Sequence, residues 1–267
     1  MGAGHAHAGV LLVLSLPYFL YLARTVRGPA VRAAPVEIRG SAWALWGPPA
    51  ALAGAVVVVA ALMLGWSGEG PGRVDTWTEA FFARHRSDVA HRTSGVFTRL
   101  GGREIVVPLG FALAAVVAYR RRSVRPLVMM AAVYLLAAGP AAFLKEFLHR
   151  AEPGDVAGEL GRSFPSGHTT QAAAVYGMAA LLWAEGASSR RRRVAAGLAV
   201  AASIVVGVAM LVRGAHWLSD VVAGYVIALP ALVTVAAVSV LVRSRDRDEG
   251  IRPGSRPVPR PGPHPEP

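Results

Sequence analysis

The stretch Pro-Ser-Gly-His at residues 165–168 stands directly before an apolar segment at 169–187, and His-Trp-Leu-Ser-Asp at 216–220 leads into another at 219–242. Each pattern therefore places a histidine at the end of a segment long enough to cross a bilayer. An ionisable side chain at the edge of hydrocarbon is costly and is usually functional. These two stretches predict membrane helices whose ends carry chemistry.

The rest of the chain has the composition of a membrane protein. It has 267 residues, 54% of them hydrophobic, and a mean hydropathy of +0.43. Apolar stretches of about 20 residues predict spanning helices. They lie at 8–23, 45–66, 103–119, 127–148, 169–187, 194–212 and 219–242. We expect an all-α, multi-pass helical bundle.

Charge and cysteine content exclude other classes of protein. The chain has no cysteine, which excludes disulfides and cysteine-based metal sites. The net charge of +12 would suit a nucleic-acid-binding protein, but the arginines cluster in short loops between apolar segments. That pattern indicates a membrane protein and no nucleic-acid partner.

The arginine clusters also predict the topology. If each apolar segment crosses once, three arginine runs fall on the cytoplasmic side, at 120–125, 190–193 and 243–247. The N-terminus then lies outside, with seven spans. The connections 67–102, 149–168 and 213–218 face outward and carry the candidate site residues.

Two segments are not spans. Residues 77–92 are compatible with an amphipathic helix on the membrane surface or, equally, with a solvated loop. The tail from Arg243 is rich in Pro, Gly, Arg and Asp, which predicts disorder.

His216 and Asp220 form the first candidate pair. A spacing of four places them one helical turn apart, so that Asp220 can orient the imidazole of His216 and leave its other nitrogen free. The alternative is an Asp that caps a helix beside a structural histidine.

Residues Ser166, Gly167 and His168 form the second candidate group. Backbone N–H groups at a helix start bind anions, Gly167 permits a close approach, and His168 can give a proton to a leaving group. The alternative is a turn with a serine cap.

Cations precede both groups. Lys145, the single lysine of the chain, and Arg150 end the preceding apolar segment, and Arg213 precedes His216. Together they predict a phosphate clamp, although cations that snorkel at helix ends are more common. No set of metal ligands and no serine-nucleophile motif is evident, so the pattern suits phosphoryl transfer without a metal or other cofactor.

These motifs resemble those of the type 2 phosphatidic acid phosphatases, membrane relatives of the vanadium haloperoxidases. The family motifs are Lys-x6-Arg-Pro, Pro-Ser-Gly-His and Ser-Arg-x5-His-x3-Asp, and they occur here in the same order. Counted from Lys145, the first family arginine falls on Glu152, and the Ser-Arg of the third motif falls on Ala209-Met210. Arg150 and Arg213 stand nearby as possible substitutes, and we expect Glu152 to face away.

The resemblance implies a six-helix phosphatase core at 45–242, preceded by an extra membrane helix and linker at 1–44 and followed by a cytoplasmic tail at 243–267. It implies a lipid phosphate or diphosphate substrate at the outer face of the cell membrane. It also implies a role for each site residue. His216 is the nucleophile, Asp220 orients it, His168 is the acid, and the phosphate is held by Lys145, Arg150, Ser166, Gly167 and Arg213.

Two alternatives remain. The displaced arginines suit a member of the family that binds a phospholipid or a partner without turnover. Helices rich in small residues also suit an unrelated transporter or structural membrane protein, in which Lys145, His168 and His216 would not converge. A soluble haloperoxidase does not fit so apolar a chain.

Overall fold

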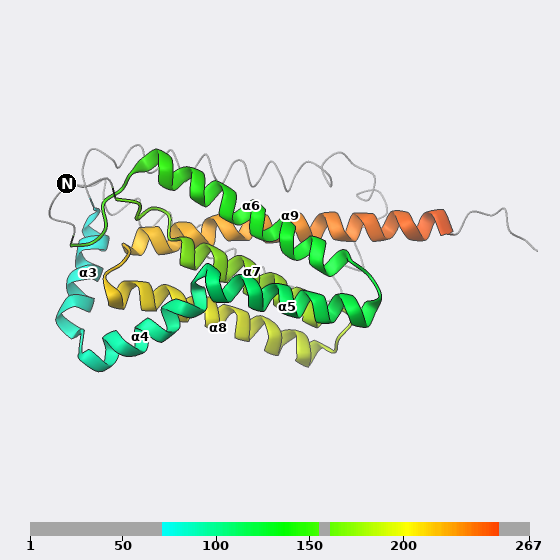
Figure 1. Ribbon diagram of the computed structural model, residues 1–267, viewed down its shortest axis with the longest axis horizontal. Helices are drawn as coiled ribbons and strands as arrows, with labels where there is room; N and C mark the ends of the chain where they lie inside the picture. The colour runs from blue at the N-terminus through cyan, green and yellow to red at the C-terminus, as the bar shows by residue number, and fades with distance from the viewer. Residues whose placement is uncertain (1–70, 155–160, 251–267) are drawn as a thin grey trace, which may run out of the picture.

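The computed structural model describes residues 71–154 and 161–250, with Leu241 and residues 243–250 as backbone only. This part of the chain contains helices and no strand, which confirms the all-α prediction (Figure 1). The helices are α3 (Arg73–His85), α4 (Asp88–Gly101), α5 (Arg103–Arg121), α6 (Arg125–Leu148), α7 (Gly167–Ala184), α8 (Ser189–Arg213) and α9 (Leu218–Gly250).

Three of these helices are long and apolar enough to cross a membrane. They are α6, α8 and the Leu218–Val240 part of α9. Helices α4 and α5 qualify together as one span bent by 48°. Helix α7 forms where residues 169–187 predicted a span, but it does not pass this test of length and hydropathy. The predicted spans at 8–23 and 45–66, with the linker up to residue 44, lie outside the described residues.

The connection 67–102 is helical over most of its described length, so the solvated-loop alternative is wrong. A single surface helix at 77–92 is also wrong, because α3 ends at His85 and α4 begins at Asp88. The break occurs where Ser87 caps the new helix, its side chain accepting from the backbone N–H of Ala90 at 3.2 Å.

Helix α7 lies in the middle of the bundle, packed against α5, α6, α8 and α9. Its alanines and glycines permit this close packing, because small side chains let helix backbones approach. Gly177 shows the tightness, since a Cβ there would lie 2.6 Å from Leu232 Cδ1 of α9.

The two ends of the bundle differ in their connections. At one end lie α3, the end of α6, the start of α7 and the α8–α9 connection; at the other lie the arginine-rich α5–α6 and α7–α8 connections (Figure 1). The change of composition at Arg243 predicted the start of a disordered tail. Helix α9 instead continues past Arg243 to Gly250. Residues 251–267 lie outside the described part.

Candidate active site

The start of α9 brings His216 and Asp220 together. Nδ1 of His216 lies 3.5 Å from Oδ2 of Asp220. Both residues are buried. Among the described residues Nδ1 has no hydrogen-bond partner, because the ring is close to the carboxylate but not yet aligned with it.

Asp220 is held by several donors from distant parts of the chain. Arg150 donates to Oδ1, and the Ser163 hydroxyl donates to Oδ2. The backbone N–H of Trp217 also donates to Oδ2, at 2.9 Å. These bonds fix the carboxylate independently of His216, so it is positioned before any substrate binds.

Asp75 of α3 is a member of this network that the sequence did not indicate. Its carboxylate accepts from the backbone N–H of Ser219 at 2.9 Å and from the Ser219 hydroxyl at 2.7 Å. It therefore caps the start of α9 from another helix. A contact between residues 144 positions apart leaves no local pattern, and Asp75 lies in a stretch that looked like a surface loop.

Arg150 joins the two buried carboxylates. Its Nη1 donates to Ser219 and Asp220, and its Nη2 donates to Asp75 at 2.8 Å. The guanidinium also lies over the Trp217 ring, 5.7 Å from its centroid. The geometry thus gives Arg150 a role that the sequence did not suggest, which is to neutralise Asp75 and Asp220. Its predicted role as a phosphate ligand stays a prediction and would compete with these bonds.

Ser166 caps α7 and connects it to α9. Its hydroxyl accepts from the backbone N–H of Thr169 at 3.4 Å, and its own N–H donates to the carbonyl of Asp220 at 3.0 Å. Gly224 permits this approach of the two helices, because a Cβ there would lie 3.0 Å from the backbone nitrogen of Thr170. The alternative of a turn with a serine cap is therefore correct as a description of the start of α7.

Lys145 lies beside that helix start. A Cβ on Gly167 would be 3.7 Å from its Cε, and its Nζ donates to the carbonyl of Arg162. The ammonium is therefore held next to the N-terminus of α7, where two sources of positive potential reinforce each other.

His168 lies at the bend between α4 and α5. Its Nε2 would be 3.7 Å from a Cβ on Gly102. Burial lowers the pKa of His168, the positive charges of His216 and Lys145 lower it further, and Glu104 opposes them. These effects favour the neutral ring, and an anionic phosphate beside it would favour the protonated form.

Arg213 and Glu152 make no hydrogen bond or ion pair with His168, His216 or Asp220 in the described part of the chain. The Arg213 guanidinium lies over α4, with Nη1 3.0 Å from where a Cβ on Gly95 would be. It makes no hydrogen bond or ion pair within the part of the chain that the structure describes. Glu152 is exposed, and the prediction that it faces away from the phosphate stays a prediction. Within residues 71–154 and 161–250, no group of three or more acidic or histidine side chains is placed to hold a metal ion.

Comparison with known proteins shows the family of the chain. The profile of the PAP2 superfamily matches residues 106–244, more than half of the chain and all of α6 to α8. The chain belongs to the PAP2 superfamily. This assignment confirms the resemblance that the three motifs indicated.

A solved structure shows the same fold. The crystal structure described as the first transmembrane PAP2-type phosphatidylglycerolphosphate phosphatase from Bacillus subtilis has a TM-score of 0.52 and 22% sequence identity to this chain. The alignment covers 91% of this chain and 98% of the other. No curated protein matches the chain. With its apolar helices, this PAP2 chain is a multi-pass membrane protein.

Proposed function

We propose that this PAP2 protein is an integral membrane phosphatase that hydrolyses a lipid phosphate or diphosphate, of polyprenyl or glycerolipid type, through a phosphohistidine. The observation that carries the proposal is the approach of His216 Nδ1 to the fixed Asp220 carboxylate, with His168 and Lys145 beside it.

The first step forms the phosphohistidine. With Nδ1 facing Asp220, the lone pair of His216 Nε2 attacks phosphorus and the bond from phosphorus to the leaving oxygen breaks. Protonated His168 gives its proton to that oxygen. Lys145 and the backbone N–H group of Gly167 balance the negative charge on the phosphoryl oxygens. The backbone N–H of Ser166 already donates to the carbonyl of Asp220, so Ser166 contributes by capping α7.

Hydrolysis then restores the enzyme. Neutral His168 takes a proton from water, the water oxygen attacks phosphorus, and the bond from phosphorus to His216 breaks to release phosphate. Each histidine ends in the protonation state in which it began. No step in this scheme requires a metal.

The topology supports a site on the outer face. The arginine-rich α5–α6 and α7–α8 connections lie at the end of the bundle opposite the start of α9, which His216 precedes (Figure 1). Positive connections stay in the cytoplasm, so the proposed site faces outward, where it can accept lipid headgroups.

The test is phosphate release from a panel of lipids by purified wild type, His216→Ala and His168→Ala. The panel holds a polyprenyl diphosphate, phosphatidic acid, phosphatidylglycerophosphate and a polyprenyl-linked sugar phosphate. We expect the wild type to release phosphate from at least one lipid of the panel, and both variants to lose this turnover. The control is His91→Ala, at an exposed histidine of α4, which should leave turnover unchanged. Turnover that survives His216→Ala would overturn the phosphohistidine.

A second candidate is a PAP2 protein that binds a phospholipid or partner without turnover. It is favoured by the engagement of Arg150 with two carboxylates and by Glu152 and Met210 at the family arginine positions. It predicts saturable lipid binding with no phosphate release from any member of the panel.

A further inference from the structure

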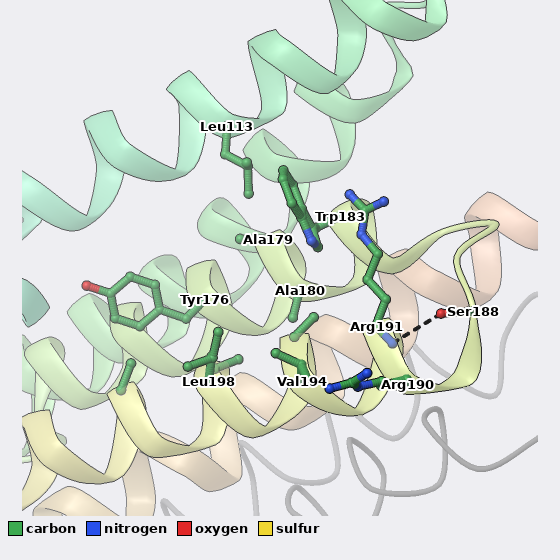
Figure 2. Close-up of a pocket in the computed structure, with 13 residues that line it drawn as sticks. Leu113, Tyr176, Ala179, Ala180, Trp183, Ser188, Arg190, Arg191, Val194 and Leu198 are labelled. Carbon is green, nitrogen blue, oxygen red and sulfur yellow. Dashed lines mark hydrogen bonds between the residues drawn. The ribbon is translucent and has the colours of Figure 1, made fainter.

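A groove of about 650 Å³ lies between α5, α7 and α8, away from the candidate active site (Figure 2). It follows α8 from Ser188 to Ala202, about 21 Å at 1.5 Å per residue. None of the residues proposed for catalysis lines it.

The walls of the groove are apolar and partly open. Leu113 of α5, Ala179 and Ala180 of α7, and Val194 and Leu198 of α8 form them. Leu198 is 66% exposed and Val194 is 55% exposed. In a membrane these side chains face acyl chains, so the groove suits a hydrocarbon chain.

One end of the groove is cationic. Arg190 and Arg191 lie there, while Tyr176 lies toward the other end (Figure 2). The Arg191 guanidinium is 4.4 Å from the centroid of the Trp183 ring, which holds the charge at the rim. The nearest acidic residue along α7, Glu185, bonds to Arg121 and Arg125 of the neighbouring helices.

The positive charge at one end of the groove and the length of the groove together indicate which ligand it binds. A lipid with a phosphate headgroup complements the two arginines, and a leaflet of about 15 Å of hydrocarbon is shorter than the groove. We propose that the groove binds an anionic phospholipid of the leaflet at the arginine-rich end, with its phosphate at Arg190 and Arg191 and an acyl chain along α7 and α8.

The experiment measures binding of phosphatidylglycerol and phosphatidylcholine to detergent-purified protein by native mass spectrometry. All variants carry His168→Ala, so that catalytic turnover cannot alter the bound lipid. We expect phosphatidylglycerol to bind more tightly. We expect Arg190→Gln and Arg191→Gln each to weaken that preference about fivefold. Arg193→Gln is the matched control, since Arg193 is exposed on the same turn of α8 and does not line the groove.

A second variant tests the groove itself. Leu198→Trp fills it without a change of charge and should reduce the binding of phosphatidylglycerol. The proposal is wrong if Arg193→Gln has the same effect as Arg190→Gln, or if Leu198→Trp has no effect. None of these outcomes depends on whether the protein is a phosphatase.

Discussion

The two ends of the bundle use arginine in opposite ways. At the α9 start, Arg150 has a side chain only 16% exposed and bonds to two carboxylates that are fully buried. At the α8 start, Arg190 and Arg191 are exposed at the rim of an apolar groove. The buried arginine holds the two carboxylates in place, whereas the exposed arginines leave positive charge available to a ligand.

The difference comes from desolvation. A buried charge must be paired, and removing its partner leaves an uncompensated charge in a medium of low dielectric constant. An exposed arginine keeps its hydration and contributes little to stability until an anion replaces the water. The same residue type thus acts in folding at one end and in recognition at the other.

The largest effect is expected at Arg150. Arg150→Ala leaves Asp75 and Asp220 without their shared cation and should lower the free energy of unfolding by about 3–5 kcal/mol. Arg193→Ala at the other end should change it by about 0.5 kcal/mol or less. Unfolding in mixed micelles by SDS titration measures both, and equal effects would remove the contrast between the ends.

The next largest effect is expected at Ser163. Ser163→Ala removes a buried hydrogen bond to the Asp220 carboxylate and should cost about 1.5–3 kcal/mol of stability. If the bond positions His216 through Asp220, kcat falls while KM changes little, and Ser163→Thr restores part of kcat. A variant that loses stability but keeps its kcat would limit Ser163 to a structural role.

The smallest effects are expected for alanine substitutions at two glycines of α8 that differ in the space around them. Gly207→Ala places a Cβ 2.5 Å from the Tyr225 hydroxyl and 2.9 Å from Val221, which should cost about 1–3 kcal/mol through overpacking. Gly197, toward the arginine-rich end, has no atom within 4 Å of the same position, so Gly197→Ala should be tolerated. Thermal unfolding of the two variants tests whether packing is tighter toward the active site.

The sequence determined what is local. Hydropathy located α5 to α9, because an apolar stretch of sufficient length forms a helix in a membrane whatever its neighbours are. The Pro-Ser-Gly-His turn and the spacing of His216 and Asp220 likewise placed each motif at a helix start. The start of α4 was missed because its cap at Ser87 lies inside the stretch 77–92, which was interpreted as one continuous segment.

Only the tertiary structure decided the partners of the charged groups. Arg150 lies 70 residues from Asp220 and 75 from Asp75, so no local pattern could distinguish a phosphate ligand from the cation that holds both carboxylates. The groove with Arg190 and Arg191 depends equally on the packing of α5, α7 and α8. Local hydropathy and turn chemistry fix helices and their ends, whereas contacts between distant residues decide whether an arginine is buried and paired or exposed and available.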